Sequence, residues 1–547
     1  MKKYYLFFAA ALVLLTSCSK EKDLYDTEKV METEVENNLK SVFGTVFSEN
    51  TDWTMIKTGQ VTITADAKLD NIEKVQVLTG YPFGPDPVYV LNETKAAKGS
   101  TVTLSYDAPD GLTRLYAACV SPEGYYRVKA FDLGTTSVKF GSSATRAVKP
   151  ATDATAEGIT VEAIDDFTET ELEEFESMIL NFIPKGHDNT LRFTQSEIYI
   201  NDANYMTTVG DDPIVVTPMH MSASYYNITR LYYYYYNPAD YEAADDKDAF
   251  LQNLPAYQIM YCKDHYDNGF YTKKVKRYTL PTITKGYKVG FFIGVDGIGD
   301  FYTDSRLNAN SMNRTAVFGA NGSNFIGFED GIAGGDRDFD DLVIEVKGGV
   351  QDIDEKYTPD PNVYTFAYED RRVGDYDMND VIVKAKRIDA THVEFSLEAT
   401  GANDELYLRS QNYIDLTKAQ KLNANTEVHA ILGTTDEEGF VNTKKQVADA
   451  VHEVFTVPED YSFYSHDLYV HNKTKGWDVH IVQHGSNPCA ILIPYDWKYP
   501  IEKNCVKNAY PQFNNWATNG GSVVSTQWYT NPVESLIYNN SFVQTAE

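Results

Sequence analysis

An acidic phrase occurs twice in this chain, and in each copy it lies between two runs of strand-forming residues. Residues 325–328 and 342–346 flank the first copy, and residues 364–368 and 381–383 flank the second. Each copy is therefore predicted to be a β-hairpin whose loop carries oxygen-bearing side chains. These side chains are Glu329, Asp330, Asp336, Asp338, Asp340 and Asp341, and then Glu369, Asp370, Asp375, Asp377, Asn379 and Asp380.

Oxygen ligands at alternate positions of a glycine-containing loop are typical of Ca²⁺ sites. Asp and Asn also form turns without any ion, which is the alternative reading. However, this many carboxylates in a short loop would repel one another without a cation. The sequence therefore predicts two Ca²⁺ sites formed by these twelve residues, and it disfavours Mg²⁺, which accepts fewer protein oxygens. Because Asp340 aligns with the neutral Asn379, the first site is predicted to bind more tightly.

The N-terminus indicates export. Lys2 and Lys3 precede an apolar run from Tyr4 to Leu15, which as a helix would span about 18 Å, too short for a hydrocarbon core of about 30 Å. The run ends in Leu15-Thr16-Ser17-Cys18, which resembles the lipobox of bacterial lipoproteins and implies diacylation of Cys18. An ordinary secretory signal with an incidental cysteine is the alternative. The expected location is the outer membrane, on its surface, with the periplasmic face as the other choice.

Composition agrees with a folded, exported protein. The formal net charge of −31 makes nucleic acid a poor partner, because each phosphate contact needs a Lys or Arg. A hydrophobic content of 43% and an aromatic content of 13% are too high for a disordered chain. With 547 residues, the chain is expected to form several domains.

Short alternating runs separated by turn residues predict a mainly β fold, made of several β-sandwiches with a few short helices. Helical spacing appears at residues 24–47 and 168–183, and a third helix is expected near 443–455. The predicted segments are a signal peptide at 1–17, a lipidated tether with a short helix at 18–52, an immunoglobulin-like sandwich at 53–142, a β-rich domain with the first acidic loop at 157–350, and a C-terminal β-domain with the second loop at 360–547.

Aromatic residues offer a second class of candidate site. Five consecutive tyrosines in a strand would place an aromatic row on each face, one of them available for stacking on a sugar or a partner. Burial of both rows in the core is the alternative. Tryptophans near the C-terminus raise the same choice. The stacking candidates are Tyr232, Tyr234, Tyr236, Trp497 and Trp516.

Residues 290–304 and 328–343 resemble a domain of unknown function found in bacterial surface and adhesin-like proteins. The second acidic phrase, together with segments 490–494, 497–503 and 508–513, resembles the LruC-domain family of Gram-negative lipoproteins. The two resemblances cover roughly residues 285 to 540. They imply an anchored, envelope-associated protein with a β-rich C-terminal region and no assigned enzymatic activity.

No HExxH, GxSxG, P-loop or dinucleotide-binding motif occurs in a suitable context, so the chain is not expected to be an enzyme. The predicted function is that of a lipid-anchored, calcium-binding cell-envelope protein, acting as an adhesin or as a module that binds a glycan or a cell-surface protein. A secreted polysaccharide hydrolase, or an accessory subunit of a polysaccharide-capture system, is one alternative. A structural component of a surface assembly is the other.

Overall fold

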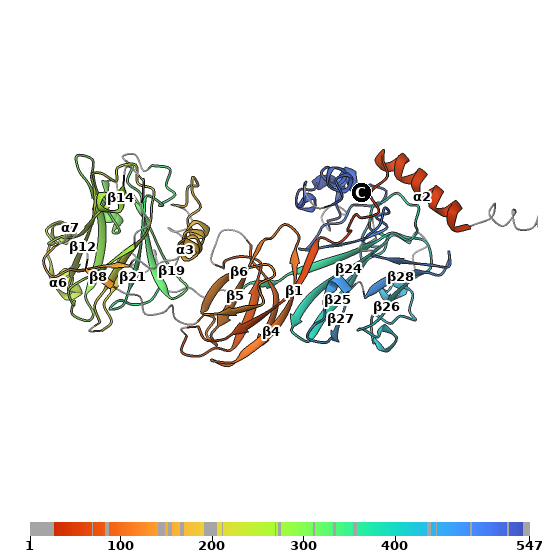
Figure 1. The fold of residues 1–547 in the computed structure, drawn as a ribbon, viewed down its shortest axis with the longest axis horizontal. Helices are drawn as coiled ribbons and strands as arrows, with labels where there is room; N and C mark the ends of the chain where they lie inside the picture. Colours follow the sequence, from red (N-terminus) through yellow and green to blue (C-terminus); the bar gives the residue numbers. More distant parts are fainter. Residues whose placement is uncertain are drawn as a thin grey trace, which may run out of the picture.

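Three β-rich blocks lie in a row along the long axis of the computed structural model (Figure 1). We refer to residues 53–140 together with the short strand at 360–361 as the N-terminal sandwich, residues 148–350 as the middle domain and residues 362–539 as the C-terminal domain. The mainly β architecture with a few short helices was predicted from the sequence and is confirmed. The structure describes residues 27–539 except 68, 83–86, 141–147, 151–155, 165–168, 191–204, 211, 268–269, 272–274, 310–311, 332–334, 354–357, 435–438, 445, 466, 482–483 and 522–523.

The N-terminal sandwich lies between the other two blocks (Figure 1). Strands such as β1 alternate between core and solvent, with Val61 and Ile63 fully buried. One sheet has the order β4 (Thr101–Pro109), β1 (Ile56–Thr64), β7 (Ser137–Lys139). The other has the order β22 (Asp360–Pro361), β3 (Tyr89–Lys95), β2 (Lys74–Leu78), β5 (Arg114–Val120), β6 (Tyr126–Asp132).

The middle domain consists of two larger sheets and helix α3 (Glu169–Phe182), which ends just before Pro184. The first sheet has the order β19 (Thr315–Ala320), β20 (Ser323–Phe328), β21 (Leu342–Lys347), β11 (Val215–Met221), β16 (Val275–Thr279), β9 (Thr160–Ile164), β8 (Val148–Pro150). The second has the order β10 (Met206–Thr207), β17 (Lys288–Val295), β12 (Thr229–Tyr236), β13 (Tyr257–Tyr261), with β18 (Gly299–Tyr302) also paired to β17. Short helices α6 (Pro238–Ala243) and α7 (Lys247–Gln252) follow β12.

The C-terminal domain has a five-stranded sheet and a three-stranded sheet. The helix expected near residues 443–455 was wrong, because Val451–Thr456 forms strand β27 with alternating half-buried and exposed side chains. The larger sheet has the order β27, β25 (His392–Ala399), β24 (Val381–Asp389), β23 (Val363–Tyr368), β30 (Ala490–Ile493). The smaller has the order β26 (Leu406–Ser410), β28 (Leu468–Asn472), β29 (Trp477–His480), and helices α8 (Val428–Ile431), α9 (Val506–Ala509) and α10 (Phe513–Thr518) complete the domain.

Both acidic phrases lie in hairpin loops, as predicted. In the first, β20 and β21 pair antiparallel up to Phe328 opposite Leu342. In the second, β23 and β24 pair up to Tyr368 opposite Val381. Each loop therefore begins directly after a buried strand end, which fixes where its carboxylates lie.

The chain segment before the sandwich packs on the C-terminal domain. Helix α2 (Thr27–Phe43) has the predicted apolar spacing, with Leu39 and Phe43 buried. Its apolar face joins an aromatic cluster that includes Trp53, Phe513 and Trp516. Figure 1 shows α2 at the same end of the molecule as the C-terminus. The helix is thus held by residues more than 300 positions later in the chain.

The N-terminal sandwich and the middle domain share a hydrophobic cluster that includes Phe182 and Phe318, whose rings stack at 4.5 Å. We predict that Phe182→Ala costs about 3–5 kcal/mol, because it leaves a cavity at a fully packed contact. Val454→Ala, at a side chain that is 52% exposed, should cost less than about 0.5 kcal/mol. Denaturant unfolding of both variants measures the difference. Equal midpoints would show that the packing of Phe182 does not stabilise the middle domain.

Candidate metal sites

Three carboxylates converge in the first acidic loop. Glu329, Asp336 and Asp338 each place an oxygen within 4.8 Å of the others. Glu329 and Asp338 are buried, whereas Asp336 is exposed. Glu329 also forms a group of the same size with Asp330 and Asp341. The first loop therefore presents a pocket of carboxylate oxygens that opens to solvent beside Asp336.

The second loop repeats this arrangement at equivalent positions. Glu369, Asp375 and Asp377 place oxygens within 4.8 Å of one another, and again the two outer residues are buried while Asp375 is exposed. The same three positions of the phrase thus converge in both copies, although the loops belong to different domains. We call these groups the first and second acidic triads.

The backbone conformation explains why the two triads match. Left-handed residues alternate with the acids in both loops, at Arg337 and Phe339 in the first and at Tyr376 and Met378 in the second, with φ between 55° and 62°. This turns the amides of Tyr376 and Met378 toward Glu369, which accepts hydrogen bonds of 3.2 and 2.7 Å from them. The side chains of the left-handed residues Phe339, Tyr376 and Met378 lie in hydrophobic clusters.

The two loops are closed by the same hydrogen bond. The Asp330 amide donates to Asp341 Oδ2 at 2.7 Å, and the Asp370 amide donates to Asp380 Oδ2 at 2.6 Å. The last acid of each phrase therefore fixes the start of its own loop. Asp341 and Asp380 thus hold the loops closed and are not members of the two triads. Asp341 belongs instead to the additional group with Glu329 and Asp330.

Burial and mutual repulsion make the charged triads costly. Burial and the neighbouring Asp336 and Asp338 raise the pKa of Glu329 to about 7. In the second loop, burial and nearby carboxylates raise the pKa values of Glu369 and Asp377 well above their usual range. Glu329 Oε2 and Asp377 Oδ1 are buried and accept no hydrogen bond. Carboxylate oxygens of this kind are the ligands that a hard cation such as Ca²⁺ binds.

Asp340, which the sequence predicts as a ligand, contacts a neighbouring segment of the chain. Asp340 accepts a hydrogen bond from Ser222 at 2.6 Å and lies 3.7 Å from Lys185 Nζ and 3.8 Å from His220 Nε2. Although burial alone would raise it, the nearby His220 and the hydrogen bond from Ser222 lower the pKa of Asp340 to about 2. Asp340 does not belong to the first triad, although its Oδ2 is buried and accepts no hydrogen bond.

Asn379 shows the same orientation in the second loop. Its Nδ2 donates to the Pro500 carbonyl at 3.1 Å, and its Oδ1 lies against Gly401. Asn379 Oδ1 is buried and accepts no hydrogen bond, and the same holds for Asp340 Oδ2 in the first loop. The order of affinities expected from these two residues stays a prediction.

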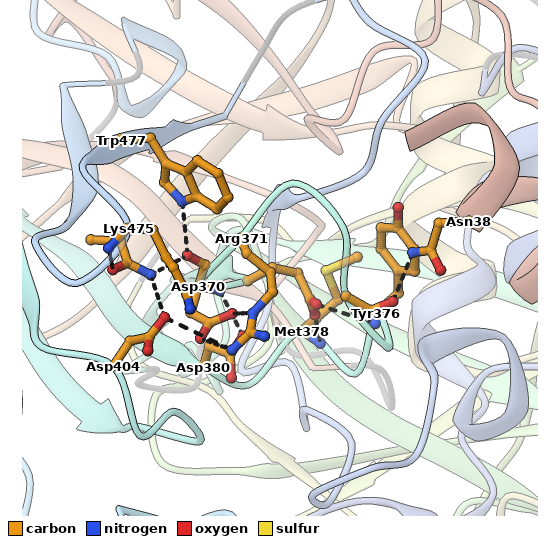
Figure 2. Close-up of polar contacts among 12 residues, drawn as sticks. Asn38, Asp370, Arg371, Tyr376, Met378, Asp380, Asp404, Lys475 and Trp477 are labelled. Atoms are coloured by element: carbon orange, nitrogen blue, oxygen red, sulfur yellow. Dashed lines mark hydrogen bonds and ion pairs between the residues drawn. The ribbon is translucent and has the colours of Figure 1, made fainter. Parts of the chain in front are cut away.

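Asp330 and Asp370 contribute mainly to holding the loops. Asp330 Oδ2 accepts from the Tyr225 amide at 3.2 Å. Figure 2 shows Asp370 paired with Arg371 through two hydrogen bonds of 2.6 and 2.8 Å, with Asp404 beyond the guanidinium. The Trp477 indole donates to the Asp370 carbonyl at 3.2 Å. These contacts attach the second loop to the three-stranded sheet.

Contacts between the second loop and two distant segments of the chain were not predicted. Asn38 of helix α2 donates to the Gly374 carbonyl at 2.9 Å, and Phe43 packs on Tyr376 with ring centroids 5.1 Å apart. The segment around Glu502 also meets the loop, since the Lys503 amide donates to Asp377 Oδ2 at 2.6 Å. Both partners are remote in sequence, so no local spacing could have pointed to them.

The aromatic stacking candidates are mostly core residues. Tyr234, Tyr236, Trp497 and Trp516 are buried, so the prediction that they stack on a ligand was wrong. Tyr234 and Tyr236 are covered by Tyr205 and by the short helices after β12, and the tryptophans pack among other aromatic rings. Tyr232 is half-buried and stacks on Phe292 at 4.8 Å. Large aromatics here mainly serve packing.

The proposed lipidation residue, Cys18, lies outside the described residues. Cys489 and Cys505 are free thiols rather than a disulfide. Among the residues that the structure describes, no helix is both long and apolar enough to cross a membrane.

Two family models match parts of the chain, and both describe domains of unknown function. DUF4114 matches residues 283–349, which include the first loop, and DUF4842 matches residues 478–529, which include Glu502. The first match agrees with the resemblance of residues 290–304 and 328–343 to a domain of unknown function. A crystal structure described as "a Putative lipoprotein from Bacteroides ovatus" is 12% identical with a TM-score of 0.23, covering 46% of this chain and 90% of that one. No curated protein matches the chain.

Gly335 tests the geometry of the first triad. A methyl group there would overlap the Glu329 carboxylate, and its φ of +53° disfavours any other residue. We predict that Gly335→Ala lowers the free energy of unfolding by more than the control Gly433→Ala does. The control has a similar backbone cost of about 1–2 kcal/mol, because its φ is +69°, but its added methyl group would meet no atom within 4 Å. Thermal unfolding of the two variants makes the comparison. A smaller loss for Gly335→Ala would mean that Glu329 does not occupy the described position.

Proposed function

We propose that this chain is a lipid-anchored, calcium-binding protein of the cell envelope, with a C-terminal region of the LruC type, which acts as a binding module at the outer membrane. The observation that carries the calcium proposal is the acidic triad, which recurs at the same three positions of two loops in different domains. Chance placement of acids on a surface would not repeat both the convergence and the burial pattern.

Electrostatics favours a bound cation. Two charged carboxylates 4.8 Å apart repel by about 3 kcal/mol at an effective dielectric constant of about 20. Burial and this repulsion raise the pKa values of Glu329 and Glu369, so without a cation these acids would tend to take up protons. With a cation, the same carboxylates stay charged and become ligands. Glu329, Asp336 and Asp338 would hold the first ion, and Glu369, Asp375 and Asp377 the second.

Ca²⁺ suits these loops better than Mg²⁺ does. Calcium takes six to eight oxygens in flexible geometry, including bidentate carboxylates, backbone carbonyls and water. Each loop offers three carboxylates, one of which is exposed, so that water can complete the shell there. Magnesium would require a near-ideal octahedron and would keep most of its own water.

The proposed role of calcium is to hold the domains in place. The first loop inserts Phe339 into the cluster between the N-terminal sandwich and the middle domain. The second inserts Tyr376 and Met378 into the cluster that holds helix α2. Fixing the loops would thus stiffen the whole row of blocks behind the lipid anchor. We propose an adhesin or a glycan- or protein-binding module rather than an enzyme, and the identity of its ligand is a matter for binding screens with the calcium-loaded protein.

We predict that the full chain binds two Ca²⁺ and that chelation lowers its melting temperature by several degrees. A ligand that binds only the folded state adds about 2.7 kcal/mol of stability at a hundredfold excess over its Kd. Glu329→Gln and Glu369→Gln should each remove one of the two bound ions, whereas Glu534→Gln, at an exposed residue, should remove none. Calorimetric titration measures the stoichiometry. The absence of bound calcium in the parent protein would refute the proposal.

We also predict that the protein, expressed with its own leader in a bacterium that processes lipoproteins, partitions into detergent. Cys18→Ala should stay in the aqueous phase or keep its leader, because acylation needs that thiol. Cys489→Ala, which removes a partly buried thiol in the C-terminal domain, should partition like the parent. If Cys18→Ala also enters the detergent phase, the protein is not anchored through this residue.

A further inference from the structure

A groove with a volume of about 910 Å³ lies between the N-terminal sandwich and the C-terminal domain. The sandwich contributes Tyr89, at the start of strand β3. The C-terminal domain contributes residues 494–498, which directly follow strand β30, and several residues between 527 and 539. Binding sites for small ligands typically measure about 300–1,000 Å³ and often lie between domains. The groove therefore has the size and the place of a ligand site.

Aromatic rings from both blocks line this groove. Tyr89 and Tyr495 are half-buried, and their ring centroids lie 5.4 Å apart. Tyr529, which is buried, continues the row with its ring centroid 6.4 Å from that of Tyr495. The groove is thus lined with tyrosine rings, and two of them keep part of their surface open to solvent. Neither Tyr89 nor Tyr495 was among the stacking candidates predicted from the sequence.

The backbone at Tyr495 is held in an unusual conformation. Its φ is 63°, in the left-handed region that an aromatic residue rarely adopts. The turn is fixed from both sides, because β30 ends in the sheet at Ile493 and the Trp497 amide donates to the Tyr495 carbonyl at 2.6 Å. Strained residues of this kind persist where the surroundings enforce them, and they are frequent at ligand sites. The ring of Tyr495 is therefore placed in the groove before any ligand arrives.

The polar groups of the groove favour an uncharged ligand. Lys498 is paired with Asp496 at 2.5 Å, and Lys384 binds the same carboxylate, so these charges are already balanced. Glu534 and Gln527 are exposed and also line the groove. Their side-chain oxygens accept hydrogen bonds. An anionic ligand would meet Glu534 and a chain whose formal net charge is −31, so it would be repelled.

A neutral saccharide matches this lining best. Its hydroxyl groups can donate to Glu534 and Gln527, and the apolar C–H faces of its rings can pack on Tyr89 and Tyr495. A proline-rich peptide would also fit an aromatic groove. However, proline has no backbone N–H, so such a peptide would leave the acceptors of the groove without donors.

We infer that this groove binds a neutral saccharide chain, with Tyr89 and Tyr495 packed against its sugar rings and with Glu534 and Gln527 bound to its hydroxyl groups. This inference rests on the proposed function, since it gives the proposed binding module a site and a class of ligand. Because the two tyrosines come from different blocks, the saccharide contacts the sandwich and the C-terminal domain together.

The test is saturation-transfer NMR on the full chain in detergent with Ca²⁺ present. The probes are cellohexaose, maltohexaose, xylohexaose and mannohexaose, an oligogalacturonate of the same length, and a decaproline peptide. We expect at least one neutral hexasaccharide to bind, and Tyr89→Ala and Tyr495→Ala each to raise its Kd about tenfold or more. Tyr413→Ala, which removes a 49% exposed tyrosine of the C-terminal domain outside the groove, should leave the Kd unchanged. Thermal unfolding of each variant confirms that it is folded.

The other outcomes separate the groove from the proposed function. If a neutral hexasaccharide binds the two groove variants and the parent equally well, the groove is not the site, but the role as a binding module stands. If decaproline binds and no saccharide does, or if the oligogalacturonate binds as tightly as the neutral probes, the inferred ligand class is wrong. If no probe binds, the inference fails, whereas the calcium stoichiometry still tests the proposed metal sites separately.

Discussion

Repulsion between buried carboxylates at the ends of two hairpins is the constraint on which the rest of this structure depends. Glu329 and Glu369 lie directly after buried strand ends, so the sheets themselves carry these charges into the protein. Three of the left-handed residues between the acids, Phe339, Tyr376 and Met378, place their own side chains in hydrophobic clusters. Each loop therefore carries both a group of carboxylates and apolar side chains that complete a hydrophobic cluster. We expect these apolar side chains to pack well only when the repulsion between the carboxylates is balanced.

The second loop brings distant parts of the chain together. Helix α2 reaches it through Asn38 and Phe43, and a C-terminal segment reaches it through the hydrogen bond from the Lys503 amide to Asp377. The helix that follows the proposed tether and the C-terminal segment thus meet at one acidic triad. A cation there would connect the anchor with the body of the protein, whereas a cation in the first loop would act between the sandwich and the middle domain, where Phe339 is buried.

Local patterns predicted local features correctly. Runs of strand-forming residues identified the strands that flank both acidic phrases, and the spacing of Leu39 and Phe43 identified helix α2. Features that depend on tertiary contacts could not be predicted. Asp340 is oriented by Lys185, His220 and Ser222, which lie in other segments of the chain. The Lys503 amide reaches Asp377 from a segment more than 120 residues after the second loop. The role of the tryptophans and tyrosines was ambiguous because the same residue types serve cores and binding faces. The helix expected near residues 443–455 was wrong, since residues 451–456 form a strand.

The central claim is that each acidic triad coordinates one calcium ion, and the most direct measurement is a crystal structure of the full chain grown with Ca²⁺, with diffraction data collected at a long wavelength. Our account predicts two peaks of anomalous difference density, one within about 2.3–2.6 Å of oxygens from Glu329, Asp336 and Asp338, and one at the same distances from Glu369, Asp375 and Asp377. Density that shows only water at both places, or carboxylates turned apart from one another, would contradict it.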